Sequence, residues 1–325
     1  MRIGIPRALL YYYYYPFWKT LFEELGCEVV LSDETNGGII SEGSKLTVSE
    51  ICVPIKLFNG HVLNLDKKNV DYILIPQFHK VKKEWYCPKF LGVPEIVEYS
   101  LTNLTTPIIV LDYVTGTDMI DSLKVHLPLT DKLGVTKKQL KSALGKARAS
   151  QEQFRSLCKQ EHTIPEVYDY MFAKKEFVQR KPGEIKIAVM GYVNNVYDNF
   201  VSMNTIEKLR EMGADVVTFD MLDEELVKRN QKEIKQPFWI FTRKIYNASK
   251  HLISRGDIDG MIHLTAFGCG PDSVIGKMME IDCEEKGVPF MTVRVDEHTG
   301  DNHVMTRLEA FTDMIKMSKR KGVKI

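Results

Sequence analysis

Short apolar runs alternate with longer amphipathic stretches in the first part of the chain. Short runs bounded by Gly, Pro or polar residues are typical of buried strands, and the stretches between them have the period of helices that cover a sheet. The predicted strands are 3–6, 27–31, 70–76 and 107–111, and the predicted helices are 11–26, 48–67 and 94–104. This alternation predicts a parallel sheet with helices on both faces.

The pattern changes in the middle of the chain and then resumes. Strand patterns are absent from about 118 to 181, and 137–159 is polar with a helical period, which indicates a helical connector. The second series consists of predicted strands 185–191, 215–219, 260–264 and 289–295 and predicted helices 199–212, 237–254, 273–286 and 305–317. We therefore expect an α/β fold with two Rossmann-like (flavodoxin-like) parallel-sheet domains, at 1–117 and 185–325, joined by a helical connector at 118–184.

Composition narrows the class of protein. The 325 residues are 44% hydrophobic and 27% charged with a net charge of +1, so no global field favours nucleic acid or an anionic membrane. No apolar run approaches the ~20 residues that span a bilayer, and the first residues lack a signal-peptide pattern. We expect a cytoplasmic protein, in which the six cysteines are free thiols or metal ligands rather than disulfides.

Three cysteines have Pro or Gly neighbours, in the segments 50–54, 86–90 and 267–271. Such neighbours give an irregular backbone and leave amide groups free to face sulfur. Cys87 and Cys269 follow predicted strands, and ligands of parallel sheets collect beyond the carboxyl ends of strands. With Cys52, these two would converge on the cleft between the domains and suit an iron–sulfur cluster with one iron left open. The alternative is that all three are buried structural thiols.

The other cysteines are expected to be structural, because they lie in regular helices or strands: Cys27, Cys158 and Cys283. The sequence has no C-x-x-C pair, so the usual zinc and ferredoxin signatures are missing. It also has neither a Walker A motif nor a G-x-G-x-x-G at a helix start, which argues against an ATPase or a nicotinamide enzyme.

An aromatic run, Tyr11–Trp18, opens the first predicted helix. One face of a domain is expected to cover only part of it, so that the remainder forms an interface. This predicts a dimer, either with a second copy or with a homologous subunit.

An acidic loop follows the last predicted strand and contains Asp296, Glu297, His298 and Asp301. Carboxylates and an imidazole at that edge of a sheet are candidates for proton transfer, with Glu297 and His298 as the candidate catalytic residues. The alternative is an ordinary hydrogen-bonded turn.

Several separated motifs together resemble one family. They are Gly4–Leu9, Glu50–Lys56, Cys87–Phe90, Phe267–Ser273, Asp296–Gly300 and Thr306–Phe311. The sequence is similar in these segments to the acyl-CoA dehydratase activase-related proteins, which belong with the cluster-binding subunits of 2-hydroxyacyl-CoA dehydratases and benzoyl-CoA reductases.

The resemblance implies that Cys52, Cys87 and Cys269 hold a 4Fe–4S cluster, whereas some related proteins hold an 8Fe–9S double cubane. It implies that a separate ATP-hydrolysing activator supplies electrons of low potential, with this chain as the acceptor. The implied reaction is reduction or dehydration of a small substrate, for which an acyl-CoA is the candidate. A non-enzymatic cluster carrier or assembly factor is the alternative.

Overall fold

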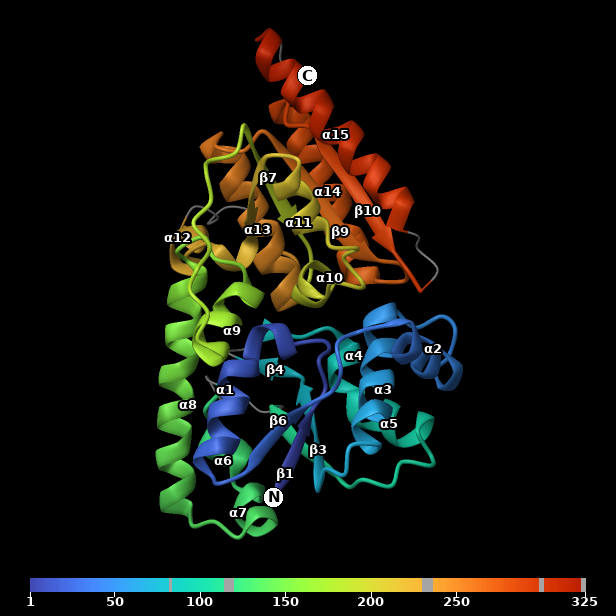
Figure 1. Ribbon diagram of the computed structural model, residues 1–325, viewed down its shortest axis with the longest axis vertical. Coiled ribbons are helices and arrows are strands. Elements are labelled where there is room, and N and C mark those ends of the chain that lie inside the picture. The colour runs from blue at the N-terminus through green and yellow to red at the C-terminus, as the bar shows by residue number, and fades with distance from the viewer. Residues whose placement is uncertain (82–83, 114–119, 230–235, 298–300, 323–325) are drawn as a thin grey trace. The chain divides into compact units, whose positions relative to one another are not determined.

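The computed structural model describes residues 1–81, 84–113, 120–229, 236–297 and 301–322 (Figure 1). The chain divides into two compact units, Met1–Ser156 and Leu157–Ile325. In its described residues, each unit contains one four-stranded sheet whose strands are all parallel. The expected α/β fold with two Rossmann-like units is therefore confirmed. The stretch that was expected to connect them is divided between the two units.

The first sheet has the strand order β2-β1-β3-β6. Its strands are β1 (Arg2–Ile5), β2 (Glu28–Leu31), β3 (Tyr72–Phe78) and β6 (Ile108–Tyr113), and a hairpin of β4 (Lys80–Val81) and β5 (Glu84–Trp85) follows β3. In the central strand β1, Ile3 pairs with Val29 on one side and with Tyr72 on the other. Ile3, Gly4 and Ile5 are all buried, as a strand covered on both faces requires.

Helices cover both faces of this sheet. They are α1 (Tyr11–Glu24), α2 (Gly37–Leu46), α3 (Val53–Asp66), α4 (Pro88–Leu91), α5 (Val93–Ser100), α6 (Leu123–His126), α7 (Pro128–Leu133) and α8 (Lys137–Cys158). In Figure 1, α1 and α6 lie on one side of the strands, and α3 and α5 lie on the other.

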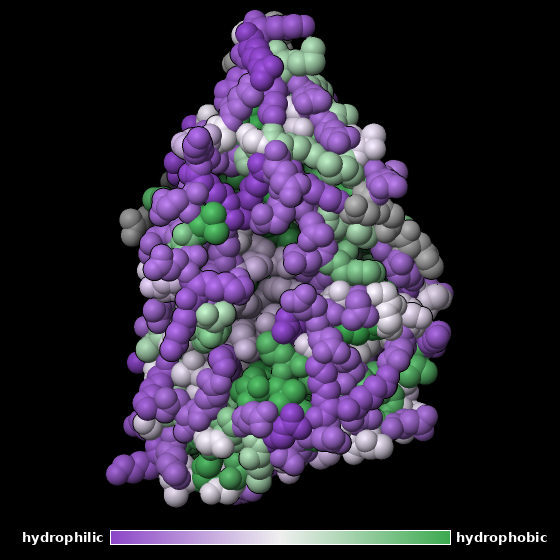
Figure 2. All heavy atoms as spheres, in the orientation of Figure 1, coloured by the Kyte–Doolittle hydropathy of each residue, from purple (hydrophilic) through white to green (hydrophobic). Residues whose placement is uncertain are grey.

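Hydrophilic side chains dominate the visible surface, and hydrophobic ones gather over the first sheet (Figure 2).

The prediction of one helix over 48–67 is wrong at its beginning. The helix of this region, α3, begins only at Val53, and a separate helix, α2, ends before the region at Leu46. Pro54 explains the start of α3, since proline is tolerated in the first turn of a helix but not in its interior. The side chain of Asn36 caps α2 by accepting from the amides of Gly38 and Ile39.

The aromatic run of α1 is buried rather than left as an exposed patch. Tyr11, Tyr13, Tyr15, Phe17 and Trp18 are each 7% exposed or less. The expectation of a large aromatic surface on this helix is therefore wrong, and the dimer inferred from it stays a prediction without this support. Aromatic side chains of β3 and β6 pack against this helix: Phe78 contacts the rings of Tyr14 and Trp18, and it stacks on Tyr113.

The second sheet has the order β8-β7-β9-β10. Its strands are β7 (Ile185–Met190), β8 (Ala214–Thr218), β9 (Gly260–Ala266) and β10 (Phe290–Val295). The helices of this unit are α9 (Ile164–Ala173), α10 (Val193–Tyr197), α11 (Thr205–Glu211), α12 (Glu224–Arg229), α13 (Ile240–Arg255), α14 (Gly270–Lys286) and α15 (Asp301–Lys321), with a 3-10 turn at Phe219–Met221. Counted along the chain, both sheets run second-first-third-fourth, so each has its switch point between the first and third strands. Within the described ranges, every helix is too short or too polar to cross a membrane.

Candidate functional site

Each of the three candidate cysteines occupies the N-cap of a helix. Cys52 precedes α3, Cys87 precedes α4 and Cys269 precedes α14. A proline stands at the first or second position of all three helices, where its missing N–H is not needed. In none of the three does the cysteine side chain form a capping hydrogen bond within its helix. A helix N-terminus favours negative charge, so these positions suit thiolates.

Cys52 and Cys87 lie close enough to influence each other. Burial raises the pKa of Cys52 to about 11, and the charge of the Cys87 thiolate adds to this rise. The Ile55 amide and the Lys89 ammonium lower the same pKa. Without a metal the Cys52 thiol therefore keeps its proton at neutral pH, and a bound cation would displace it.

Cys87 lies beyond β3 and the β4–β5 hairpin. Burial raises the pKa of its thiol, whereas the amides of Lys89 and Phe90 and the Lys89 ammonium act in the opposite direction. Tyr86, the preceding residue, is buried, and its hydroxyl lies 3.1 Å from that of Tyr14 on α1. The aromatic core of the first unit thus fixes the chain on the N-terminal side of Cys87.

Cys269 follows β9 after a sharp turn. Gly268 has a φ of +77°, a left-handed conformation that glycine adopts without strain. The helix predicted at 273–286 begins three residues earlier than expected, because α14 starts at Gly270 with Cys269 as its N-cap. The Ser273 hydroxyl donates to the Cys269 carbonyl oxygen at 2.7 Å, inside the first turn.

Cys87 and Cys269 occupy corresponding places in the two sheets. Each follows the third strand of its sheet, next to the strand pair where the topology switches. Ligands of open α/β sheets bind beyond the carboxyl ends of strands at this switch point. The structure therefore supports a ligand-facing location for both thiols, each within its own unit.

The structure leaves the joint site of the three cysteines untested. Among the described residues, no group of three or more His, Cys, Asp or Glu side chains is arranged to hold a metal ion. Cys52 and Cys87 belong to the first unit and Cys269 to the second. The three-cysteine cluster site and its location in a cleft thus stay predictions.

The remaining cysteines are buried, as expected. Cys27, Cys158 and Cys283 are all at most 8% exposed. Cys283 packs against β9 with its sulfur 3.8 Å from that of Met261, and burial raises its pKa to about 12. These environments are those of small apolar side chains.

The acidic loop is only partly described. His298 lies outside the described residues, while Asp296 and Glu297 directly follow β10. The amide of Phe267 donates to the Val295 carbonyl oxygen at 2.8 Å, which ties the end of β10 to the segment that leads into Cys269. The backbone before Glu297 therefore runs beside the Cys269 turn, and a catalytic role of Glu297 stays a prediction.

Sequence reasoning missed a buried pair close to Cys269. His263 of β9 and Asp272 of α14 are hydrogen-bonded at 3.1 Å and are almost fully buried. The available signal was one histidine in the largely apolar strand Gly260–Ala266. The partner could not be identified from sequence, since it depends on how α14 packs on the sheet.

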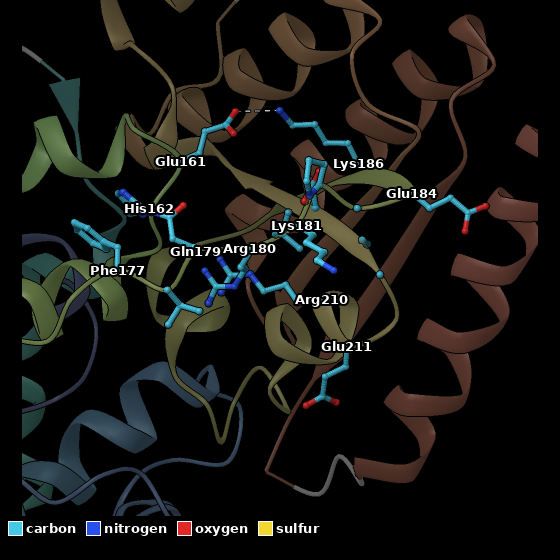
Figure 3. Close-up of a pocket in the computed structure, with 17 residues that line it drawn as sticks. Glu161, His162, Phe177, Gln179, Arg180, Lys181, Glu184, Lys186, Arg210 and Glu211 are labelled. Carbon is cyan, nitrogen blue, oxygen red and sulfur yellow. Dashed lines mark hydrogen bonds and ion pairs between the residues drawn. The ribbon is translucent and has the colours of Figure 1, made fainter.

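A separate cavity of about 820 Å³ lies at the amino ends of β7 and β8, the opposite edge of the second sheet from Cys269 (Figure 3). Lys186 on its wall pairs with Glu161 at 3.0 Å. Arg180 and Arg210 both pair with Glu166. Burial by itself would raise the pKa of Glu166, but hydrogen bonds from Thr163 and the two arginines lower it to about 2. These cations are therefore already neutralised by carboxylates and offer little attraction for an anion.

The fold and the three capped helices define a two-unit α/β protein that presents thiols at helix N-termini. Residues 2–222 match the family model described as CoA enzyme activase uncharacterised domain, and residues 139–315 match that of the 2-hydroxyglutaryl-CoA dehydratase D-component. Each match spans more than half of the chain, so the chain belongs to the acyl-CoA dehydratase activase-related superfamily. By family it is a dehydratase-type component.

The solved structures that match this chain resemble it only weakly. The laminin-binding protein Lbp of Streptococcus pyogenes is 7% identical, with 97% of each chain covered and a TM-score of 0.28. A putative two-component response regulator/GGDEF domain protein is 11% identical, with 97% of this chain and 99% of that chain covered and a TM-score of 0.23. These scores are too low to support an argument. A search of the curated proteins finds no match.

Proposed function

We propose that this chain is an iron–sulfur protein that accepts low-potential electrons from an ATP-dependent activator. The electrons would serve the reduction or dehydration of a small substrate, with an acyl-CoA as the candidate. The observation that carries the proposal is the N-cap position of Cys52, Cys87 and Cys269, in a chain of the dehydratase family.

The donor set fits a cluster. Soft thiolate ligands are those that iron–sulfur clusters use. Cys52 and Cys87 are electrostatically coupled neighbours, and amide groups of Ile55, Lys89 and Phe90 act on their sulfurs. Amides directed at sulfur stabilise thiolate charge and tune the potential of a cluster. Loading would release protons from thiols that are otherwise protonated.

The number of suitable thiols favours a single 4Fe–4S cluster per chain. A double cubane of the 8Fe–9S type needs about six thiolates if one chain holds it. The other three cysteines, Cys27, Cys158 and Cys283, are buried in packed positions, away from helix N-termini. Three ligands leave one iron open, and a cluster bound there would supply one-electron chemistry.

This chain's own residues would give the site its environment. Phe267 and Val274, which precede and follow Cys269 in the sequence, are 68% and 61% exposed, so their apolar side chains are available to cover a group bound there. Apolar surroundings lower the local dielectric and strengthen electrostatic interactions with bound charge. Glu297, next to the Cys269 turn, is the candidate for moving or holding a proton.

The test has two stages. Protein purified without oxygen is analysed for iron, acid-labile sulfide and EPR signal, and we expect ~4 iron atoms per chain. The loaded protein is then incubated with an activator of this superfamily, ATP, a reductant and acyl-CoA substrates. Absence of iron and sulfide would overturn the proposal. Loading without turnover would favour the cluster carrier, which transfers its iron and sulfide to an apo-dehydratase.

A further inference from the structure

His263 and Asp272 form a sealed contact between β9 and the first turn of α14. His263 Nε2 lies 3.1 Å from Asp272 Oδ1, and the two side chains are 1% and 0% exposed. The carboxylate accepts from the imidazole N–H in the tautomer that protonates Nε2. This bond joins the strand to the helix three residues after Cys269.

The imidazole ring also packs directly on the helix backbone. A Cβ placed on Gly276 would lie 2.6 Å from both Cε1 and Nδ1 of His263. No side chain other than hydrogen fits between this ring and α14 at that position. The ring therefore fixes the helix at Gly276 by contact and at Asp272 by its hydrogen bond, one helical turn apart.

Each member of the pair also has a second polar atom, which is buried and forms no hydrogen bond. Among the described residues, His263 Nδ1 and Asp272 Oδ2 are buried without a hydrogen bond. Buried polar atoms without partners destabilise the folded state, and an apolar pair of the same volume would avoid this cost. Stability alone therefore does not explain why a histidine and an aspartate occupy these positions. A hydrogen bond of fixed direction between the strand and the helix does explain it.

The turn that carries Cys269 is fixed at its other positions too. Gly268 provides the left-handed residue before it, and the Ser273 hydroxyl holds the Cys269 carbonyl oxygen. Asp272 adds a side-chain link from this turn to the sheet. The orientation of the thiol then depends on that link, because the N-cap position moves with the first turn.

We propose that His263 and Asp272 are positioning residues, which hold the first turn of α14 on β9 and so set the direction in which Cys269 presents its sulfur. What the sulfur binds rests on the proposed function. Whether the turn is rigid does not depend on the proposed function. The positioning role and the proposed function can therefore be disproved separately.

Four variants test the proposal. Asp272→Ala removes the link, Asp272→Asn keeps an oxygen acceptor, and His263→Gln keeps a donor amide. Cys283→Ala weakens the same β9–α14 interface away from the first turn, at the Met261 contact, and serves as the stability control. Hydrogen exchange of the Ser273 amide, which donates to the Cys269 carbonyl oxygen at 3.0 Å, is measured on metal-free protein. Iron content is measured after anaerobic reconstitution.

We expect faster exchange of the Ser273 amide in Asp272→Ala, together with a ~10–100-fold loss of iron affinity, seen as a lower iron content after reconstitution. Asp272→Asn and His263→Gln should exchange like the wild type. Cys283→Ala should melt earlier yet keep both the exchange of this turn and the iron content. Wild-type exchange in Asp272→Ala, or an equal acceleration in Cys283→Ala, would overturn the positioning role. If the wild type takes up no iron, the proposed function falls, and the exchange measurements still decide the role of the pair.

Discussion

Gly43 of α2 and Gly60 of α3 face each other where the two helices cross, so closely that neither position has room for a side chain. A Cβ on Gly43 would lie 1.9 Å from the Lys56 carbonyl oxygen, and one on Gly60 would lie 2.1 Å from that of Ile39. The helices therefore pack backbone against backbone. Because α3 begins directly after Cys52, this crossing fixes where that cysteine lies.

The crossing predicts a marked effect of one methyl group. Gly60→Ala should lower the free energy of unfolding by ~1–3 kcal/mol, because the two backbones must separate. Gly145→Ala is the control, since Gly145 lies in α8 with nothing near its Cβ, and it should stabilise the protein by ~0.5–1 kcal/mol. Urea unfolding measures both, and a Gly60→Ala protein as stable as the wild type would contradict the crossing.

The cysteine ligands predict a clear division among variants. Cys52→Ala, Cys87→Ala and Cys269→Ala should each lose the brown chromophore and the bound iron, because each removes one of three thiolates. Cys158→Ala should keep its iron while losing some stability, since that side chain is fully buried. Iron and sulfide analysis with absorption spectra, all without oxygen, measures the outcome.

Each departure from that pattern has a distinct meaning. Wild-type iron in the Cys87 variant would remove this residue from the ligand set. An equal loss of iron in the Cys158 variant would instead favour a cluster with six thiolates.

Two buried histidines predict acid sensitivity of the first unit. Burial lowers the pKa of His61 to about 3 and that of His126 to about 4, from an ordinary value of 6.5. The unfolded chain binds protons below pH 6.5 while the folded chain does not, so stability is complete above that pH and falls as the pH drops towards 4. Each histidine contributes a slope of ~1.4 kcal/mol per pH unit.

Urea unfolding at several pH values between 7 and 5 tests this. His61→Gln should unfold with a shallower dependence on pH than the wild type, because its share of the proton uptake is removed. His303→Gln, at an exposed position of α15, is the control and should keep the wild-type slope. An unchanged slope in His61→Gln would show that His61 takes up its proton in the folded state.

Glu297 allows a direct comparison between its two roles. If it transfers protons, Glu297→Gln should leave the melting temperature and the cluster spectrum unchanged and slow turnover by ~10²–10⁴-fold. If it only holds the turn after β10, stability should fall by ~1–3 kcal/mol and activity should follow it. Melting curves and turnover on the same anaerobic preparation distinguish the two.

The sheets were largely predictable from sequence. The run at 185–191 became β7 at Ile185–Met190, because an apolar run that ends in glycine has few alternatives to a buried strand. Helix α2 was missed, since Gly37, Gly38 and Gly43 lower helix propensity. Gly43 is required only by the close crossing with α3, and a local sequence pattern does not reveal such a crossing. Asn36, which caps α2, is a residue type typical of helix N-caps.

The candidate site was predictable in part. The Pro and Gly neighbours singled out the three cysteines, but they were interpreted as irregular backbone, and a helix start was expected just after Cys269 alone. Pro54, Pro88 and Pro271 each follow a cysteine within two residues, and this spacing is typical of the first turn of a helix. The pairing of His263 with Asp272 was beyond sequence reasoning, because it exists only once α14 is packed on β9.

The N-cap position gives the three cysteines a thermodynamic disadvantage that natural selection must overcome. Ser, Thr, Asp and Asn are the favoured residues there, because an oxygen accepts hydrogen bonds from the first-turn amides more strongly than a sulfur does. Drift under selection for folding alone would replace them. Relatives that abandon the chemistry should therefore carry serine or aspartate at these positions and melt at higher temperatures.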